Sequence, residues 1–309
     1  MEVRSLGYRT DLAILALEGS QVTDRGDHLV IRTLSNPDYW WGNFLLLRDL
    51  QPGSGGGWMA RFAAEFPDAR HTALGLDEPG VRAVDPGELA GMTMERNAVM
   101  TATSVHAPPH PNTEAVFRTL EGDADWQQSL ELTAAVYAGE PGGDAGFLTA
   151  QLAAKRALTE AGHGTWSGAF LDGTLVSQLG LITVESGLAR YQSVETHPAA
   201  RRRGLAGTLV WHAGATALTG GTRTLVMVAE PDDAAIRVYR SVGFTVTEHQ
   251  LSFIHQPAQS LPAKVTRTTT TRPPRHPRPH QMTRRCALTG NNHRMEGSSQ
   301  LPRAARPPE

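Results

Sequence analysis

The segment from residue 192 to residue 210 restricts the possible folds of this chain more than any other. It reads QSVETHPAARRRGLAGTLV, so an extended stretch ends near Thr196 and Pro198 stops it. Three arginines follow, and Gly204 then opens an apolar stretch at helical spacing. Small residues in a first helical turn let a ligand approach the unpaired N–H groups there, and those groups attract an anion. The pattern predicts a strand, a basic loop and a helix that begins at an anion site.

A simpler interpretation of the same letters stays open at this point. An Arg-Arg-Arg-Gly run is also typical of an ordinary basic surface loop before a helix. The loop lacks the Gly-Lys-Ser/Thr ending of a P-loop and the Gly-x-Gly-x-x-Gly spacing of a dinucleotide-binding fold. Those two classes of nucleotide-binding site are therefore excluded, and the wider sequence has to decide between the rest.

Regular patterns continue through the second half of the chain. Apolar residues recur at helical spacing in some stretches and alternate or run together in others, with Asp172-Gly173 as a hairpin turn. We expect helices at residues 125–137, 146–161, 204–218 and 233–241, and strands at residues 166–171, 175–184, 189–195, 224–228 and 245–253. This order predicts an α/β fold of the α+β type, in which helices flank a mixed sheet.

Two spaced motifs in this half resemble a known family. They are, in chain order, Arg201-x-x-Gly204-x-Ala206 and Asp232-x-x-Ala235-x-x-x-Tyr239-x-x-x-Gly243-Phe244. Together they resemble the two signatures of the GNAT superfamily of N-acetyltransferases, whose second signature usually begins with Asn where this chain has Asp232. That departure leaves the role of Asp232 open. The resemblance covers roughly residues 114–256 and implies a GNAT-like mixed central sheet flanked by helices.

The resemblance also implies an enzyme that moves an acetyl group from acetyl-coenzyme A to an amine, directly and within a ternary complex. Tyr239 corresponds to the general acid of the family, which protonates the departing coenzyme A thiolate. A splay between the strand at Val194 and the following strand would open the slot for the pantetheine arm. The residues that the resemblance assigns to the cofactor are Val194, Glu195 and Thr196 for the arm, Arg201, Arg202, Arg203, Gly204, Leu205 and Ala206 for the pyrophosphate, and Asp232.

The sequence does not identify the group that accepts the amine proton, and it does not identify the acceptor substrate. The attacking amine must be neutral, so some group must accept its proton. The sequence does not choose among four candidates for that base, which are Glu185, Glu195, Glu230 and His197. The acceptor amine is a small molecule or a protein. The rival functions are a non-catalytic acetyl-coenzyme A sensor and a nucleic-acid-binding protein that acts through its basic segments.

The first half of the chain looks like a degenerate copy of the second. Residues 29–34 (LVIRTL) and 115–120 (AVFRTL) are alike, which indicates an internal duplication with a spacing of about 86 residues. Residues 92–102 then match the strand at Val194, but residues 103–109 lack a glycine-rich basic loop, so we expect no cofactor site there. We interpret the GSGGG run at residues 53–57 as a flexible loop and residues 106–112 as a plain linker.

Composition divides the chain into three parts. Residues 257–309 hold ten basic against two acidic residues, so the net charge of −2 hides a segment of +8 joined to a body of about −10. This Pro-, Thr- and Arg-rich segment cannot bury enough surface to offset its ordering entropy, so we expect a disordered basic tail. The predicted domains are residues 1–110, a degenerate GNAT-like domain, residues 111–256, the N-acetyltransferase domain, and residues 257–309, the tail.

The remaining features narrow the class of protein. The single cysteine, Cys286, lies outside the body, which excludes an internal disulfide, a cysteine cluster for a metal and a cysteine nucleophile. We expect no metal cofactor. No stretch of 18 apolar residues or signal peptide occurs, so we expect a cytoplasmic protein with no membrane partner. The basic tail lacks interleaved aromatic residues, which disfavours nucleic acid as a partner, and a homodimer is compatible with the sequence.

Overall fold

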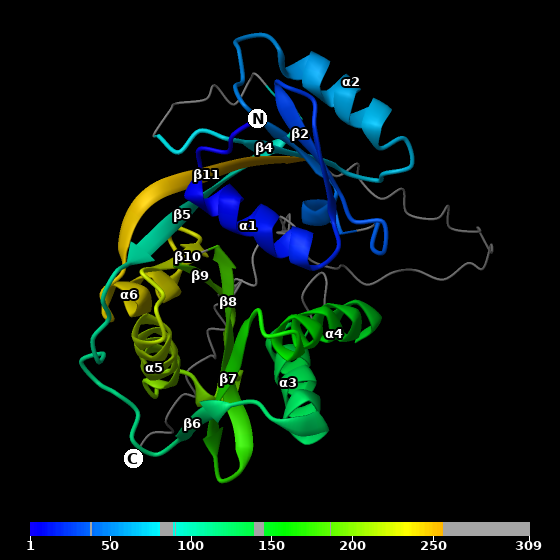
Figure 1. The fold of residues 1–309 in the computed structure, drawn as a ribbon. Helices are drawn as coiled ribbons and strands as arrows, with labels where there is room; N and C mark the ends of the chain where they lie inside the picture. Colours follow the sequence, from blue (N-terminus) through cyan, green and yellow to red (C-terminus); the bar gives the residue numbers. More distant parts are fainter. Residues whose placement is uncertain (38, 81–88, 90, 139–144, 186, 256–309) are drawn as a thin grey trace, which may run out of the picture.

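The computed structural model describes residues 1–37, 39–80, 89, 91–138, 145–185 and 187–255 (Figure 1). The predicted tail, residues 257–309 with Cys286, lies outside the described residues. The first elements are α1 (Leu6–Leu17), β1 (Gln21–Asp24), β2 (His28–Arg32), η1 (Trp40–Gly42), β3 (Phe44–Leu47), α2 (Gly55–Glu65), β4 (Thr72–Leu76) and β5 (Thr93–Ala102). The later ones are β6 (Val116–Thr119), α3 (Gly122–Val136), α4 (Ala145–Glu160), β7 (Gly164–Leu171), β8 (Thr174–Glu185), β9 (Leu188–Thr196), η3 (Pro198–Ala200), α5 (Leu205–Thr219), β10 (Thr224–Ala229), α6 (Ala234–Arg240) and β11 (Thr245–His255).

One mixed sheet joins all of these strands. Within the described residues it has 11 strands in the order β1-β2-β3-β4-β11-β5-β10-β9-β8-β7-β6. Helices flank it, which confirms the predicted fold class. The turn predicted at Asp172-Gly173 is present, and both residues have positive φ, 48° and 79°, as a two-residue hairpin loop requires.

The two halves of the chain repeat one strand pattern. In the first half, antiparallel β1, β2 and β3 lead through α2 to β4, which runs parallel to β3. In the second half, antiparallel β7, β8 and β9 lead through α5 to β10, which runs parallel to β9. This correspondence confirms two tandem related halves.

The spacing between the halves differs from the predicted one. Equivalent elements begin at Gly55 and Leu205, or at Thr72 and Thr224, so the spacing is about 150 residues rather than 86. Residues 29–34 belong to β2, which corresponds to β8, whereas residues 115–120 hold the edge strand β6. The two segments are alike in letters, but one is largely buried and the other is largely exposed at the sheet edge, so they do not occupy equivalent places.

The last strand of each half is exchanged with the other half. β5 follows β4 in the chain, yet it pairs with β10 and β11. β11 follows β10 in the chain, yet it pairs with β4 and β5. The prediction that residues 92–102 match the strand at Val194 is therefore wrong, because β5 is the counterpart of β11 and not of β9.

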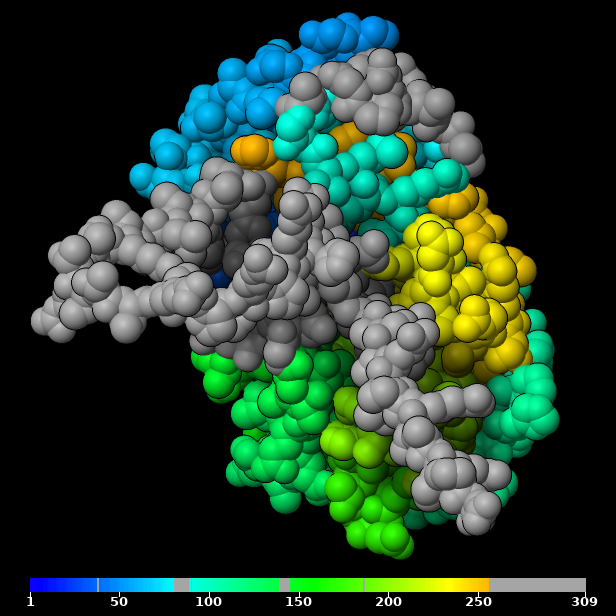
Figure 2. Space-filling view, turned by 180° about the vertical axis from the view of Figure 1, so that it is seen from behind, coloured from blue at the N-terminus to red at the C-terminus, as the bar shows by residue number. Residues whose placement is uncertain are grey.

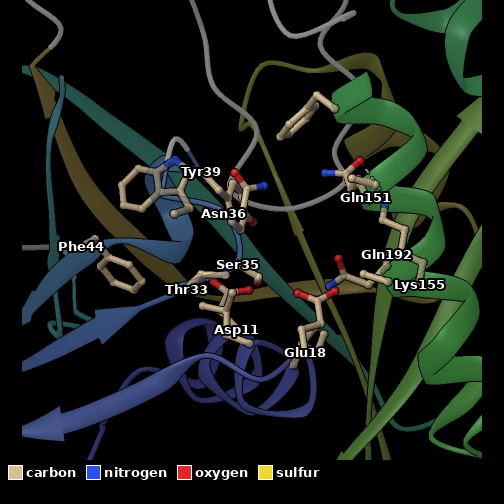
Figure 3. Close-up of a pocket in the computed structure, with 16 residues that line it drawn as sticks. Asp11, Glu18, Thr33, Ser35, Asn36, Tyr39, Phe44, Gln151, Lys155 and Gln192 are labelled. Carbon is tan, nitrogen blue, oxygen red and sulfur yellow. Dashed lines mark hydrogen bonds between the residues drawn. The ribbon is translucent and has the colours of Figure 1, made fainter. Parts of the chain in front are cut away.

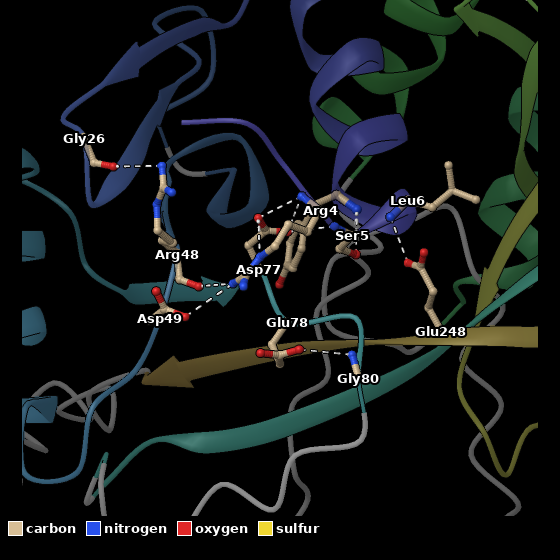
Figure 4. Close-up of polar contacts among 11 residues, drawn as sticks. Arg4, Ser5, Leu6, Gly26, Arg48, Asp49, Asp77, Glu78, Gly80 and Glu248 are labelled. Atoms are coloured by element: carbon tan, nitrogen blue, oxygen red, sulfur yellow. Dashed lines mark hydrogen bonds and ion pairs between the residues drawn. The ribbon is translucent and has the colours of Figure 1, made fainter.

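Two carboxylates hold the N-terminus of helix α1 against the sheet, one directly after β4 and one on β11 (Figure 4). The fully buried Asp77 carboxylate accepts hydrogen bonds from the backbone N–H groups of Arg4 (2.9 Å) and Ser5 (2.8 Å). The Glu248 carboxylate on β11 accepts another from the N–H of Leu6 (2.8 Å). A helix start carries unpaired donors and a positive dipole end, so two carboxylates are favourable partners there.

The helices cover the two faces of the sheet unequally. α5 packs on one face, where the Tyr191 hydroxyl donates to the Val210 carbonyl (2.8 Å). α3 and α4 lie on the opposite face of β7, β8 and β9, and α1 lies on that face farther along the sheet (Figure 1). Seen from behind, the α2 region (light blue) and the α3–α4 region (green) occupy opposite ends of the molecule (Figure 2). The sheet therefore separates the α5 face from a face on which α1 and α4 approach each other.

Candidate active site

A gap in the sheet opens between β9 and β10. The two strands pair in parallel only from Leu188 to Arg190, opposite Thr224 to Val226. Beyond that point β10 continues to pair with β5 as far as Ala229, and the pairing of β9 that the described residues show is with β8. Val194 lies on β9 beyond the point where β10 diverges, at the splay that the resemblance implies.

A β-bulge shapes β9 where the gap begins. The register with β8 shifts between Gln192 and Glu195, and Ser193 has a left-handed φ of 47°. The extra residue turns Ser193 toward α4, where its hydroxyl accepts a hydrogen bond from the Lys155 ammonium (2.6 Å). Val194 packs on the other face, in the apolar core beneath α5. The bulge thus places the consecutive residues Gln192 and Ser193 on the same α4 face, whereas in a regular strand they would point to opposite faces.

The predicted anion site is a loop of free backbone donors. Within the described part of the chain, no hydrogen bond is made by the backbone N–H groups of Arg202, Arg203, Gly204, Leu205, Ala206 and Gly207. Arg202 (φ 63°) and Gly204 (φ 75°) are both left-handed, which bends the loop sharply into α5. A run of donors at a helix start, beside exposed arginines, fits a diphosphate.

The segment before β6 lies against this loop, so it is not a plain linker. The Asn112 side chain donates to the Arg203 carbonyl (2.9 Å), and its backbone N–H donates to the Thr208 hydroxyl (2.8 Å). A Cβ on Gly204 would come within 2.4 Å of the His110 carbonyl oxygen. These contacts use carbonyl and hydroxyl groups and leave the free N–H groups of the loop untouched.

Tyr239 lies in α6 and is buried in the same apolar core as Val194. Burial raises the pKa of its hydroxyl well above the ordinary value, and the nearby Asp233 carboxylate raises it further. The hydroxyl makes no hydrogen bond with the residues that the structure describes. A phenol that holds its proton so firmly is present in the form that a general acid needs.

The predicted base candidates are placed very differently. Glu185 forms an ion pair with Arg9 (2.6 Å) at the end of β8, and His197 caps η3 by accepting from the Ala199 N–H (3.2 Å). Glu195 is buried on the α3 face, where its carboxylate accepts from Gln178 (2.7 Å) and Thr133 (2.8 Å). Burial raises the pKa of Glu195, and the Lys155 ammonium opposes that shift. Glu230 stands just before α6 and is half-buried.

The remaining predicted residues occupy supporting positions. Thr196 exchanges a hydrogen bond with the Ser177 hydroxyl (2.8 Å), and its carbonyl accepts from the Arg201 guanidinium (3.3 Å). Arg203 forms an ion pair with Glu114. Asp232 is exposed, and the cap of α6 is its neighbour Asp233, whose carboxylate accepts from the Ala235 N–H (2.9 Å). The structure therefore gives the capping role to a residue that the motif did not single out.

The first half has its own loop at the equivalent place. The segment between β3 and α2 corresponds to the loop between β9 and α5, so the prediction that residues 103–109 are its counterpart is wrong. Gly55, Gly56 and Gly57 form the first turn of α2, which corrects the interpretation of the glycine run as a flexible loop. The N–H of Gly57 already donates to the Ser54 carbonyl (3.0 Å). This loop also lacks the three consecutive arginines of its counterpart.

Comparison with known proteins agrees with this geometry. Residues 130–244 match the family model of the acetyltransferase (GNAT) family. Residues 130–244 form a GNAT domain. The match begins inside α3 and ends at Phe244, and it includes the bulged strand, the free-donor loop and Tyr239. The two motifs of the sequence thus lie within the GNAT domain.

Solved structures share the fold of a longer part of the chain. A functionally unknown conserved protein from Staphylococcus epidermidis is 11% identical with a TM-score of 0.61, covering 76% of this chain and 93% of its own. A GCN5-related N-acetyltransferase from Kribbella flavida is 16% identical with a TM-score of 0.55, covering 83% and 98%. One from Sphaerobacter thermophilus is 18% identical with a TM-score of 0.54, covering 77% and 84%. At these identities the likeness concerns the fold alone.

Three further searches, one among curated proteins and two within the described residues, found no match or site. No curated protein matches the chain. None of the helices that the structure describes is long and apolar enough to span a bilayer. The described residues also contain no group of three or more His, Cys, Asp or Glu side chains placed to hold a metal ion.

Proposed function

We propose that the chain transfers an acetyl group from acetyl-coenzyme A to an amine. One observation carries the proposal: the six backbone N–H groups from Arg202 to Gly207, which have no partner among the described residues, stand at the start of α5 next to the strand that parts from β10. A diphosphate fits the donors. An extended arm fits the open edge of β9, because a strand edge pairs with extended ligands as with another strand.

The chemistry follows from the groups on the two sides of β9. The amine nitrogen forms a bond to the acetyl carbon, the carbon–sulfur bond breaks, and the thiolate takes the proton of the Tyr239 hydroxyl. Backbone N–H groups of β9 at the gap stabilise the negative charge on the carbonyl oxygen as the nitrogen attacks. Burial keeps the Tyr239 hydroxyl protonated at neutral pH, so its proton is available as the carbon–sulfur bond breaks and sulfur gains negative charge.

Glu195 is the best placed of the four predicted bases. It lies on β9, two residues beyond the bulge, on the face opposite to α5. Its raised pKa brings a carboxylate closer to the range in which it can accept a proton from an amine at neutral pH. We therefore assign the amine proton to Glu195, directly or through water.

Thermal unfolding with acetyl-coenzyme A tests the cofactor site. At about a hundred times its dissociation constant, the ligand should stabilise the full chain by about 3 kcal/mol. Arg202→Glu should remove most of this effect, because it places a negative charge in the free-donor loop. The matched control is Arg70→Glu, the same charge change at an exposed position outside the GNAT domain. Gly204→Glu is a poor test, since the new side chain would collide with the His110 carbonyl.

Release of free coenzyme A with a panel of amines tests the reaction. The parent chain should turn over at least one amine, and Tyr239→Phe should lose most of the turnover while keeping the acetyl-coenzyme A stabilisation. Stabilisation without turnover of any amine would identify a sensor instead. Equal stabilisation of the parent chain and Arg202→Glu would show that the cofactor binds elsewhere.

A further inference from the structure

A cavity of about 570 Å³ lies where the two halves of the chain meet, on the α4 face of the bulged strand (Figure 3). α1 and the segment after β2 line one side of it, and α4 with Gln192 of β9 lines the other. Gln192 precedes the bulge residue Ser193, so the cavity adjoins the strand along which the acetyl donor is proposed to lie. Its volume is that of a small-molecule site.

Glu18 and Lys155 line this cavity with opposite charges. They attract each other, and Lys155 also attracts Glu195, but within the described residues neither Glu18 nor Lys155 is in direct ion-pair contact with an opposite charge. Glu18, at the end of α1, makes no hydrogen bond or ion pair through its carboxylate. Lys155 of α4 donates only to uncharged atoms, Gln151 Oε1 (3.1 Å) and Ser193 Oγ (2.6 Å). Figure 3 shows Glu18 and Lys155 on adjacent walls, with the side chain of Gln192 between them in this view. Both side chains are half-buried and make no direct ion-pair contact, so a ligand that carries both signs can pair with each of them.

The third charged residue of the lining, Asp11, already has charged and hydrogen-bonding partners within the protein. Asp11 forms an ion pair with Arg190 (3.0 Å) and accepts a hydrogen bond from the Gln250 amide (2.7 Å). Asp11 therefore forms part of the cavity wall, and its charge is neutralised by Arg190. The available charges are those of Glu18 and Lys155.

The rest of the lining is largely apolar. Its aromatic members are Tyr39, Trp41, Phe44 and Phe147, and Ile14 and Leu15 add aliphatic surface. Trp41 and Phe44 are buried in the core of the first half, which makes that wall rigid. Such a lining suits a ligand with a bulky apolar body beside its charged groups.

We propose that this cavity binds the acceptor substrate and that the acceptor is an α-amino acid with a large apolar or aromatic side chain. Its carboxylate pairs with Lys155, its ammonium pairs with Glu18 before deprotonation, and its side chain lies against the aromatic wall. This inference rests on the proposed acetyl transfer, because the cavity adjoins the strand along which the acyl group would arrive. The first half of the chain then supplies one wall of the acceptor site, although the family match does not include it.

Calorimetric titration with three related probes tests the charge pairing. L-phenylalanine carries both charges, phenethylamine lacks the carboxylate, and 3-phenylpropanoate lacks the amine. L-phenylalanine should bind the full chain about tenfold to a hundredfold more tightly than either analogue, because each charge-assisted hydrogen bond contributes to that degree. Comparable affinity for phenethylamine and L-phenylalanine, or no binding of L-phenylalanine with or without coenzyme A, would overturn the proposal.

Two variants assign each charge to its residue. Glu18→Gln should weaken L-phenylalanine and phenethylamine and leave 3-phenylpropanoate unchanged. Lys155→Met should weaken L-phenylalanine and 3-phenylpropanoate and leave phenethylamine unchanged. Glu160→Gln, at the exposed end of α4, is the matched control and should change none of the three. Equal effects of a variant on all three probes would contradict the pairing.

The acetyl-coenzyme A stabilisation is measured in parallel on every variant. If it persists while no probe binds selectively, the amino-acid inference fails and the proposed cofactor site stands. If it is absent from the parent chain while L-phenylalanine binds with the expected selectivity, the cavity is an amino-acid site and the proposed acetyl transfer fails.

Discussion

The buried pair of Asp11 and Arg190 joins the two halves of the chain at the scale of single residues. Arg190 is fully buried on β9, and its guanidinium contacts Asp11 (3.0 Å) and the Thr10 hydroxyl (2.6 Å) of α1. Burial raises the pKa of Asp11, and Arg190 is the largest opposing influence. The pair thus places two charges in the interior, and each depends on the other for its solvation.

Removing one member of this pair should be costly. Arg190→Leu leaves the Asp11 carboxylate buried without its cation, so the free energy of unfolding should fall by about 3 to 5 kcal/mol. The double variant Asp11→Leu with Arg190→Leu should recover most of that loss, because no unpaired charge remains. Urea unfolding of the three variants measures both effects. A double variant as unstable as Arg190→Leu would contradict this account.

Glu195 should make stability depend on pH in a defined direction. A carboxyl whose pKa is raised by folding adds stability that is fully present below its unfolded pKa, near 4.3, and that is lost as pH rises through the folded value. The free energy of unfolding of the parent chain, minus that of Glu195→Gln, should therefore fall as pH rises from 4 toward neutrality. Urea unfolding at several pH values measures this difference. A difference that grows with pH would show that Lys155 outweighs burial.

Residue patterns predicted the loop and the tyrosine of the proposed acetyl-coenzyme A site, and they did not point to the cavity proposed for the acceptor. The arginine loop and Tyr239 were predicted because each belongs to a local motif whose spacing is visible in the letters. Glu18 and Lys155 lie on different helices of different halves, and only the folded chain brings them to one cavity. No local pattern marks such residues, since each is unremarkable within its own amphipathic helix.

At the scale of elements, the start of α1 shows how a carboxylate can fix a helix to a sheet. Asp77→Ala removes hydrogen bonds from the N–H groups of Arg4 and Ser5 and leaves those donors buried. The free energy of unfolding should fall by about 2 kcal/mol, as expected for charge-assisted hydrogen bonds at a helix start.

Asp49→Ala is the control for this prediction. Asp49 is half exposed and contacts the Arg4 guanidinium at 3.4 Å, so its loss should cost less than about 1 kcal/mol. Chemical unfolding monitored by circular dichroism compares the two variants. Equal losses would mean that the surface ion pair, and not the buried carboxylate, holds α1.

The elements themselves were largely predictable, while their pairing was not. β10 extends one residue beyond the predicted strand 224–228, and each end of α5 lies one residue after the corresponding end of the predicted helix 204–218. The hydrophobic period and the flanking glycines define both elements locally. The partner of a strand depends on contacts with distant sequence. Residues 92–102 were correctly predicted as a strand, and yet β5 pairs with β10 and β11 in a way that no local pattern specifies.

At the scale of the whole molecule, the exchange of β5 and β11 should make the halves interdependent. Residues 111–256 expressed alone lack β5, which separates β10 from β11 in the sheet. We expect this fragment to show no cooperative thermal unfolding, because β10 and β11 each lose a partner. A chain of residues 1–256 should unfold in one transition and keep the acetyl-coenzyme A stabilisation. Differential scanning calorimetry makes the comparison, and a cooperative transition of the fragment would contradict it.

The exchange of strands also has a consequence for folding while the chain is being synthesised on the ribosome. β4 is made early, but β11, which covers its open edge, is made about 170 residues later. At typical rates of synthesis this interval is on the order of 10 to 30 s. Throughout that time the N-terminal segment exposes an unpaired edge of apolar residues, which is the kind of surface that chaperones capture. Translation speed and chaperone supply should therefore govern the yield of this protein more strongly than its final stability does.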